Sequence, residues 1–341
     1  MGVNLTPIIH KQVVTLGDLR GRSFAVDAFV VLHQFLALIR KRDGRPLTDP
    51  NGGVTSHLVG LVFRTTRLVS DFGMNLVFVF DGRPPVLKSV ELEKRREARE
   101  NAERDYEAAI SVGDYSLARS KAVMTGRLTD GGIKDAKRLL TLLGIPWIQA
   151  PSEGEAQATY LARKGKVWAV NSQDYDSLLY GAPRLVRYIT IQGEEWLPSK
   201  GRARKLEPEI IELDNLLSKL EVSREQLIDI AILIGTDYNS GVRGVGPKTA
   251  LKTIRRYGRL EDVPNELVER LPPNVPEIRR IYLEPEVTDD YSLEEGNLRE
   301  EELLEFLCSE KGFSRDRVDT VIQRMKRARS QRSLRDWMGG P

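Results

Sequence analysis

The stretch Leu76-Val77-Phe78-Val79-Phe80-Asp81-Gly82 is an apolar run that ends directly in a carboxylate and a turn residue. Such a short run suits a buried strand, because a strand covered on both faces needs no polar side. Three other short, mainly apolar runs also lead into acidic residues: residues 23–26, 145–149 and 167–171. Segments of helical period follow these runs, which predicts an α/β fold with a mostly parallel, twisted sheet flanked by helices.

The acidic residues after these runs form a set. In open parallel sheets, ligands bind outside the carboxyl ends of the strands, so carboxylates from four strand ends can share one rim. A further acid follows the apolar stretch 227–234 in Gly235-Thr236-Asp237. The full set is Asp27, Asp81, Glu153, Glu155, Asp174, Asp176 and Asp237. Taken singly, these acids have structural explanations: Asp81 can form a turn, Glu155 a capping box with Ser152, and Asp174 a helix cap.

Together, the acids indicate a metal site. So many like charges at one rim destabilise the fold unless cations neutralise them or their pKa values rise. Two divalent cations about 4 Å apart would remove this cost, activate a water molecule for in-line attack on phosphorus and stabilise the leaving oxygen. The chain has three histidines and one cysteine, so oxygen ligands and Mg²⁺, with Mn²⁺ as an alternative, are favoured over zinc.

Composition excludes several classes of protein. Hydrophobic residues make up 40% and charged residues 30%, which is typical of a globular chain, and the single Cys308 excludes an internal disulfide. No apolar stretch reaches membrane-spanning length, and no charged leader with a cleavage site precedes the first apolar run. We therefore expect a cytoplasmic protein without a membrane partner.

Two segments depart from the strand–helix alternation. Residues 84–128 are highly charged and rich in Glu, Lys, Arg and Ala, which predicts a helical insertion beside the sheet. After Leu227 the chain is expected to be helical, apart from a Pro-rich connection over residues 271–285.

The segment Gly241-Val242-Arg243-Gly244-Val245-Gly246-Pro247-Lys248-Thr249 combines glycines with a proline suited to the first turn of a helix. Glycines permit close backbone approach, and free amides at a helix start attract phosphate. A nucleotide-binding P-loop needs Lys directly after its last Gly, and here Pro247 intervenes. The segment favours a helix-hairpin-helix that grips a DNA backbone, supported by basic runs over residues 241–259 and 321–335.

The order of these motifs resembles the flap endonuclease family of structure-specific 5′ nucleases, over nearly the whole chain. The matching motifs are Asp27, Asp81-Gly82-x-Pro84-Pro85, Ala150-Pro151-Ser152-Glu153-Gly154-Glu155-Ala156, Asp174-x-Asp176, Gly235-Thr236-Asp237-Tyr238 and the glycine segment. The resemblance implies a PIN-like core and a single nuclease domain over residues 1–330. Within it we expect a helical arch at 85–128, a helix-hairpin-helix at 225–260 and C-terminal helices at 300–330.

The resemblance also implies an activity: cleavage of branched DNA near a 5′ flap, with 5′–3′ exonuclease activity, in Okazaki-fragment maturation and repair. It makes the acidic set the ligands of two Mg²⁺ ions, directly or through water. Lys88 and Arg95, seven apart and so on one helical face, match a basic pair that steers the scissile phosphate. Gly2 matches a residue near the active site once Met1 is removed.

Other residues match DNA-contacting positions of the family. In the hairpin these are Arg243, Gly244, Gly246, Lys248 and Thr249. His33 stands where the family usually has a tyrosine that stacks on a base. Imidazole stacks more weakly, and a partly buried helix histidine is an equally good interpretation.

The last residues, Gln331-x-x-Leu334-x-x-Trp337-Met338, are similar to a sliding-clamp-binding motif, although Met338 breaks its aromatic pair. We expect residues 331–341 to form a flexible clamp-binding tail, the alternative being a tail whose apolar residues have no partner. By the same resemblance, eukaryotic relatives carry a long lysine-rich tail that does not follow the motif here, so we expect an archaeal-type cytoplasmic protein with nucleoid-associated work. We expect a monomer.

Two other functions stay open at this point. The acids could be structural in a non-catalytic scaffold that binds DNA or the clamp. Alternatively, a metal nuclease of the PIN-like type could act on RNA or on bubble DNA. The glycine segment favours duplex DNA and the arch favours a free 5′ end, but neither excludes a bubble.

Overall fold

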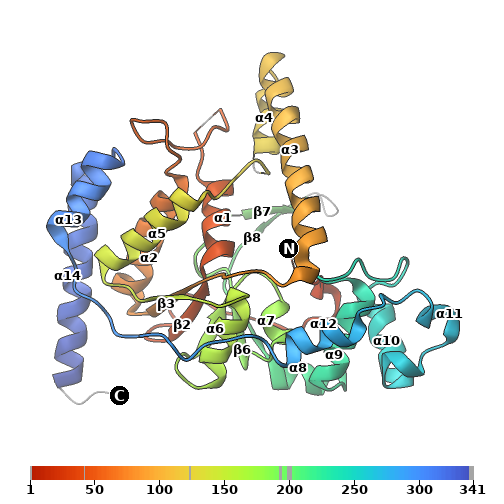
Figure 1. Cartoon of the computed structure of the whole chain (residues 1–341). Helices are drawn as coiled ribbons and strands as arrows, with labels where there is room; N and C mark the ends of the chain where they lie inside the picture. Colours follow the sequence, from red (N-terminus) through yellow and green to blue (C-terminus); the bar gives the residue numbers. More distant parts are fainter. Residues whose placement is uncertain (1, 42, 123, 192–193, 198–201, 338–341) are drawn as a thin grey trace.

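The computed structural model describes residues 2–41, 43–122, 124–191, 194–197 and 202–337 (Figure 1). At its centre, these residues form a seven-stranded sheet in the order β1-β9-β6-β5-β2-β3-β4. The strands are β1 (Gln12–Val13), β2 (Ser23–Asp27), β3 (Asn75–Phe80), β4 (Trp147–Gln149), β5 (Ala169–Asn171), β6 (Arg184–Arg187) and β9 (Glu209–Glu212). In this sheet β9 pairs antiparallel with β6 and β1, and the other pairings are parallel. The predicted mostly parallel α/β sheet is confirmed.

The register brings the carboxyl ends of four strands to one edge. Asp27 lies opposite Val79 in the β2–β3 pairing, and Phe80 lies opposite Gln149 in the β3–β4 pairing. On the other side of β2, Val26 lies opposite Asn171 of β5. The segments that leave β5, β2, β3 and β4 therefore start side by side.

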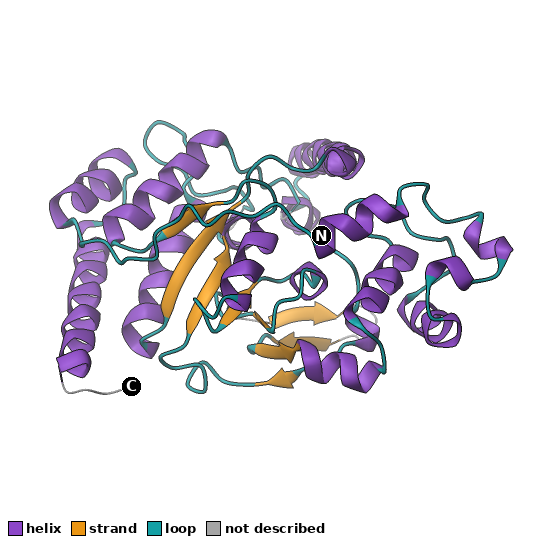
Figure 2. Cartoon of the chain, turned by 60° about the horizontal axis from the view of Figure 1, so that its bottom comes forward, coloured by secondary structure: helices purple, strands orange, loops and turns teal. Residues whose placement is uncertain are grey.

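Successive side chains of the strands point to opposite faces of the sheet, and they pack into two hydrophobic cores, one on each face. Phe24 and Phe78 belong to one core, whereas Ala25 and Val77 belong to the other. Figure 2 shows helices on both faces. The first core packs helices α1 (Ala28–Leu38), α2 (Ser56–Phe72), α5 (Asp130–Leu143), α13 (Glu300–Leu304), the π-helical η5 (Glu305–Glu310) and α14 (Arg315–Trp337). The second packs α6 (Gly154–Arg163), α7 (Asp176–Leu179), α8 (Leu213–Leu220), α9 (Arg224–Ile234), α10 (Pro247–Tyr257) and α12 (Val275–Leu283).

The charged insertion forms two helices that rise away from the sheet in Figure 1, α3 (Ser89–Ser111) and α4 (Tyr115–Ala122). A short 3-10 turn, η2 (Val86–Lys88), leads into α3. The buried residues of α3 are Ala102 and Ala109. Because the helix buries so little apolar surface, its sequence needs no apolar stripe. We call α3 and α4 the arch.

The connection predicted between residues 271 and 285 is wrong in one respect, because it contains helix α12. Pro276 occupies the first turn of α12, where a missing N–H costs nothing, so proline does not prevent this helix. Three shorter elements complete the chain around the cores: η1 (Thr6–Ile8), η4 (Leu260–Asp262) and α11 (Asn265–Val268). A two-stranded ribbon of β7 (Glu194–Leu197) and β8 (Arg202–Lys205) lies outside the main sheet.

The C-terminal helices lie where the sequence placed them, but α14 continues through Trp337. The flexibility and the clamp-binding role expected of residues 331–341 stay predictions, whereas the backbone of residues 331–337 continues the helix. The physical reason is that no glycine or proline occurs between Arg315 and Trp337 to end the helix. Residues 338–341 lie outside the described residues. Within the described chain, none of the helices has the length and apolar character needed to span a bilayer.

Candidate active site

The acidic residues gather where four parallel strands end. Asp27 ends β2 and caps α1, since its Oδ1 accepts a hydrogen bond of 3.0 Å from the amide of Val30. Asp81 follows β3, and its Oδ1 accepts a 2.7 Å bond from the amide of Gly154 at the start of α6. These bonds fix each carboxylate to the first turn of a helix, where amide donors favour negative charge.

One acid after each of β4 and β5 is held in a similar way. Asp176 begins α7, and its Oδ1 accepts a 2.9 Å bond from the amide of Val3. Glu155, in the first turn of α6, accepts a 2.7 Å bond from the hydroxyl of Ser177. The segments after β4 and β5, which are not adjacent in the sheet, are thus joined through a side chain that the sequence singled out.

Two of the structural explanations for single acids fail. The N-cap of α6 is Glu153, without a side-chain capping bond, so Ser152 and Glu155 do not form a capping box. The N-cap of α7 is Tyr175 rather than Asp174. Asp81 and Gly82 lie in an irregular loop, where Gly82 donates to the carbonyl of Ser152 and an added Cβ at Gly82 would lie 2.2 Å from the carbonyl oxygen of Ala150.

Burial and mutual repulsion raise the pKa values of the clustered carboxyls. Burial, then Asp81 and Asp174, raises the pKa of Asp27 to about 8. Burial, then Asp237 and Asp174, raises the pKa of Asp176 to about 7. Burial and Glu153 raise the pKa of Asp81 to about 6, and burial with Asp176 and Asp27 raises that of Glu155 well above its usual value. Each acid is therefore close enough to its neighbours to be repelled by them, which is the condition expected of a cation site.

The basic pair predicted from the sequence lies against the acidic set. Lys88 Nζ is 2.5 Å from Glu153 Oε2 and 3.3 Å from Asp237 Oδ2, and Arg95 Nη2 is 2.7 Å from Asp237 Oδ1. Burial alone would lower the pKa of Lys88, but Glu153 and Asp237 raise it, so this ammonium stays charged. Lys88 and Arg95 thus place two cationic groups at the foot of the arch.

The carboxylates have the oxygen donors that a hard divalent cation prefers, but they are not yet arranged around a common metal position. All donors are carboxylate oxygens, which suit Mg²⁺ and Mn²⁺. Among the described residues, however, no three acidic, histidine or cysteine side chains are already arranged to hold a metal ion. Several of these oxygens already accept hydrogen bonds from amides or from Ser177, or pair with Lys88 and Arg95, so a metal ion would share or replace these partners.

The N-terminal segment lies against the same site. A Cβ added at Gly2 would lie 2.5 Å from Asp176 Oδ1, so only glycine fits beside that carboxylate. His33, in α1, is partly buried, and burial followed by the charges of Arg99 and Arg95 lowers its pKa to about 4. The imidazole is therefore neutral at neutral pH and lies close to the arch.

The glycine segment joins α9 to α10. Gly241 has φ 72°, and an added Cβ there would lie 2.2 Å from the carbonyl oxygen of Ile234, so the turn requires glycine. Gly246 is the N-cap of α10 and Pro247 occupies its first turn, as the sequence predicted. The five residues matched to DNA contact are all exposed: Arg243, Gly244, Gly246, Lys248 and Thr249.

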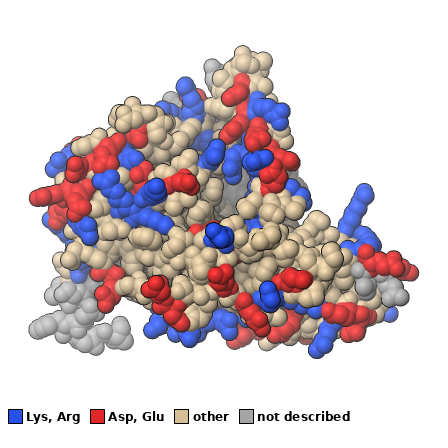
Figure 3. Space-filling model, in the orientation of Figure 1, with Lys and Arg blue, Asp and Glu red and all other residues tan. Residues whose placement is uncertain are grey.

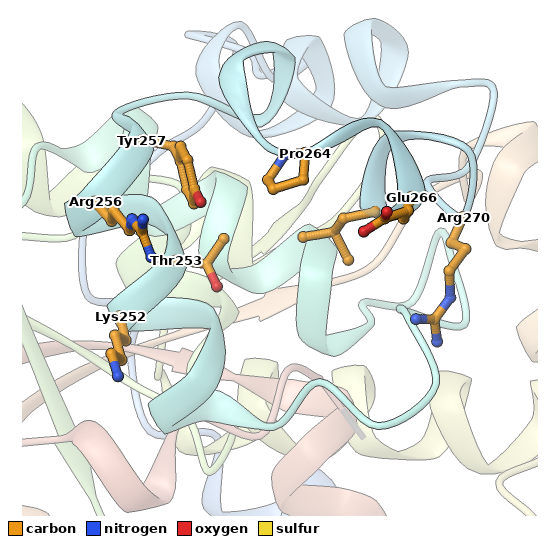
Figure 4. Close-up of a pocket in the computed structure, with 8 residues that line it drawn as sticks. Lys252, Thr253, Arg256, Tyr257, Pro264, Glu266 and Arg270 are labelled. Atoms are coloured by element: carbon orange, nitrogen blue, oxygen red, sulfur yellow. The ribbon is translucent and has the colours of Figure 1, made fainter.

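A crevice beside this hairpin contains residues that the sequence did not single out (Figure 4). Lys252, Arg256 and Tyr257 line it from α10, and Glu266 and Arg270 line it from the chain after α10. Arg270 donates a hydrogen bond to the carbonyl of Arg243, which braces the hairpin. Arg270 was missed because only the fold brings it next to a residue 27 positions earlier.

Charged side chains are unevenly spread over the face seen in Figure 3. The molecule is hollowed beside the arch, and blue Lys and Arg atoms lie on both sides of the hollow. A phosphate backbone entering there would meet positive charge before it reached the acidic rim. Of the suggested clamp-binding residues, Gln331 is exposed in α14, Leu334 and Trp337 continue the helix, and Met338 lies outside the described residues.

Comparison with known proteins agrees with this arrangement. The XPG N-terminal domain model matches residues 1–102, and the XPG I-region model matches residues 144–237. Both basic residues and all the clustered acids fall within these ranges. Flap endonuclease 1 of Methanopyrus kandleri is 50% identical over 332 residues, covering 95% of this chain and 94% of that protein. Flap endonuclease 1 of Thermococcus onnurineus is 46% identical over 343 residues, covering 99% of each.

Solved structures give the same result. Flap endonuclease-1 from Methanococcus jannaschii superposes with a TM-score of 0.77 at 40% identity, covering 97% of this chain and 100% of that chain. The catalytic core of Rad2 in complex with DNA substrate superposes with a TM-score of 0.69 at 25% identity, covering 92% of this chain and 96% of that chain.

Proposed function

This chain belongs to the flap endonuclease family of structure-specific 5′ nucleases, and from that premise we propose that it is a magnesium-dependent hydrolase of DNA phosphodiesters. It cuts near the junction of a 5′ single-stranded flap with duplex DNA and has 5′–3′ exonuclease activity. Its role is in Okazaki-fragment maturation and repair. The observation that carries the proposal is the convergence of the acidic set on one rim, with Lys88 and Arg95 above it.

We assign the metal to the acidic set. Burial and mutual repulsion raise the pKa values of Asp27, Asp81, Glu155 and Asp176, and divalent cations would relieve both effects. When bound, two Mg²⁺ ions would activate a water molecule and stabilise the leaving oxygen. Mn²⁺, with the same preference for oxygen ligands, is the expected substitute.

The chain's own residues place the phosphodiester. Lys88 and Arg95 are held at the rim by Glu153 and Asp237. Cations bound by the acidic set would take up the charge of these carboxylates and leave the basic pair free to bind the phosphate. Holding the phosphate there orients the scissile bond above the carboxylates. The amide of Val3 holds Asp176 through its hydrogen bond, and Gly2 leaves room beside that carboxylate.

The other elements select the substrate. Exposed backbone and basic side chains of the hairpin grip duplex DNA without reading its bases. The arch stands over the rim and receives a single strand that has a free 5′ end. Neutral His33, near the arch, can stack on a base beside the cut.

We further propose that the protein works as a monomer in an archaeal-type cytoplasm and binds a sliding clamp. The clamp contact is made by Gln331, Leu334, Trp337 and Met338. Since α14 includes the first three of these residues, the contact starts from a helical end rather than from an extended tail.

The test is cleavage of a panel of labelled substrates: a 5′ DNA flap, a blunt duplex, single-stranded DNA, a bubble and a flap made of RNA. Each is incubated with Mg²⁺ and with chelator, using the wild type, Asp81→Ala and Asp71→Ala. We expect the flap to be cut fastest, and only with Mg²⁺. Asp81→Ala should bind the flap without cutting it, whereas Asp71→Ala, an exposed acid on α2, should behave as the wild type. Equal cutting of every substrate would reject the structure-specific proposal, and faster cutting of the bubble or the RNA would replace it.

A further inference from the structure

The short segment between β5 and α7 carries two members of the acidic set. Residues 173–175 form a bend, and Asp174 and Asp176 lie on either side of Tyr175. A bend has no ladder of backbone hydrogen bonds, so other parts of the molecule must fix its conformation.

Arg187, the last residue of β6, contacts this bend at two points. Its Nε donates a 3.0 Å hydrogen bond to the carbonyl oxygen of Gln173, the peptide group that precedes Asp174. Its Nη1 donates a 2.6 Å bond to the hydroxyl of Tyr175, and the guanidinium lies 4.5 Å from the centre of the Tyr175 ring. The two contacts therefore lie on the two sides of Asp174.

Arg187 is itself held in place. Nη1 lies 3.3 Å from Glu209 Oε2 on β9, and the Arg187 side chain is only 11% exposed. Lys11 Nζ lies 2.6 Å from Oε1 of the same glutamate, so Glu209 keeps a cationic partner if Arg187 is replaced. The hydroxyl of Tyr175 also lies 3.3 Å from that of Thr6, next to the N-terminal segment that binds Asp176.

We propose that Arg187 is a positioning residue that fixes the Asp174–Asp176 bend and thereby sets how tightly the site binds divalent cations. This inference rests on the proposed function, because it takes both aspartates as metal ligands. A planar guanidinium can hold a carbonyl and a hydroxyl at once, which the single ammonium of lysine cannot do in the same geometry. Groups that orient metal ligands typically change metal affinity or activity about 10- to 100-fold when they are removed.

The experiment compares the wild type with Arg187→Met, Arg187→Lys and a matched control, Arg184→Met. Arg184 lies on the same strand and pairs with Glu212 of the same neighbouring strand, but its side chain is 39% exposed. Two quantities are measured: binding of Mn²⁺ to the DNA-free protein by calorimetry, and the Mg²⁺ concentration that gives half-maximal single-turnover cleavage of a 5′ flap. Flap binding in chelator and the melting temperature serve as folding controls.

We expect Arg187→Met to weaken Mn²⁺ binding and to raise the half-maximal Mg²⁺ concentration by about 10-fold or more. High Mg²⁺ should restore most of the cleavage rate, which would not happen if the variant were simply misfolded. Arg187→Lys keeps a charge beside Glu209 but should also weaken Mn²⁺ binding and raise the half-maximal Mg²⁺ concentration. This variant therefore tests the positioning role even if Arg187→Met folds poorly. Arg184→Met should match the wild type.

A wild-type metal requirement in both Arg187 variants would overturn the positioning role while leaving the proposed function intact. Equal shifts in the Arg184 and Arg187 variants would also overturn it, because the effect would then follow from general loss of charge on β6. Cleavage by the wild type in chelator would instead remove the proposed function, and this inference with it.

Discussion

Asp27 caps a helix and belongs to the acidic set. The first role favours the charged carboxylate, and the second favours the neutral acid. Its bond to the amide of Val30 favours the carboxylate, whereas burial and Asp81 disfavour it. Asparagine can still accept the capping bond but carries no charge. In chelator at pH 8 we expect Asp27→Asn to be more stable than the wild type by about 1 to 3 kcal/mol, and to cut no flap. Urea unfolding with a cleavage assay tests this, and a less stable variant would show that repulsion at the rim is negligible.

His57, which is not part of the acidic set, provides a test of how burial changes a pKa. Within the described residues neither of its ring nitrogens has a hydrogen-bond partner, and burial lowers its pKa to about 4. A histidine with a lowered folded-state pKa contributes stability above pH 6.5, which is lost as the pH falls towards 4.

For His57 we therefore expect a loss of about 2 kcal/mol between pH 7 and pH 5, given 1.36 kcal/mol per pKa unit. Urea unfolding at both pH values should show that the change in stability between pH 7 and pH 5 is less unfavourable in His57→Phe than in the wild type by about this amount, because the other titrating groups are common to both proteins. His10→Phe, which replaces an exposed histidine, should match the wild type. His57→Phe should lack that part of the pH dependence. An unchanged pH dependence in His57→Phe would mean that the ring is not desolvated as the structure describes.

The acids could be predicted from the sequence because each follows an apolar run, and parallel strands place such residues at one edge. The residues that support them could not be predicted in the same way. Arg187 and Arg270 reach their partners only after β6 lies beside β5, or after the chain beyond α10 turns back on the hairpin. The residues next to Arg187 and Arg270 in the sequence show no periodic pattern and no turn motif that would identify these arginines as supporting residues.

At the scale of elements, α3 shows how two neighbouring arginines differ in role. Arg95 faces the rim and bonds Asp237, whereas Arg96 points to solvent, is 65% exposed and pairs with Glu93. We expect Arg95→Ala to lower the single-turnover cleavage rate by about 100-fold, because it removes a donor aimed at the reacting phosphate. Arg96→Ala should retain nearly the full rate. Similar losses in the two variants would mean that the arch acts only through its total charge.

The hairpin makes a different contribution, which is measured by binding. Lys248→Ala should weaken binding of flap and blunt duplex alike and reduce the slope of log K against log salt by about 1. Lys166 provides the matched control, because it is exposed and precedes β5, at the edge of the sheet opposite the acidic rim. A loss confined to the flap substrate would show that Lys248 recognises the junction instead of the duplex backbone.

Element boundaries were predicted less well than element types. The charged insertion was recognised as helical from its composition, but its break at Gly113, with φ 73°, could not be inferred from charge alone. Helix α12 was missed because Pro276 was read as a connection signal, although proline is tolerated in the first turn of a helix. The end of α14 was placed too early because the resemblance to a clamp motif outweighed the helix-forming residues around Leu334.

At the scale of the whole molecule, α14 lies away from the hairpin and the arch in Figure 1. A clamp bound at its end would therefore leave the rim open to DNA. We expect the double variant Leu334→Ala/Trp337→Ala to lose binding to an archaeal sliding clamp in calorimetry, and to cut flaps at the wild-type rate without the clamp. Retained clamp binding would place the contact elsewhere on the protein.

Two hydrophobic cores, one on each face of the sheet, keep the four strand ends in register, and this register lets residues more than 200 positions apart meet at one rim. The fold thus holds together a group of like charges that local structure alone would separate. Burial and repulsion of these acids destabilise the metal-free protein, so bound cations are expected to stabilise the fold.

The most direct test of this account is the single-turnover rate of 5′-flap cleavage as a function of Mg²⁺ concentration, for the wild type and Asp81→Ala. The wild type should show no cleavage in chelator and a rate that rises with Mg²⁺ to saturation, while Asp81→Ala stays at background at every concentration and binds the flap as tightly as the wild type. Cleavage in chelator at the saturated rate, or a normal rate from Asp81→Ala, would contradict a cation site at the acidic rim.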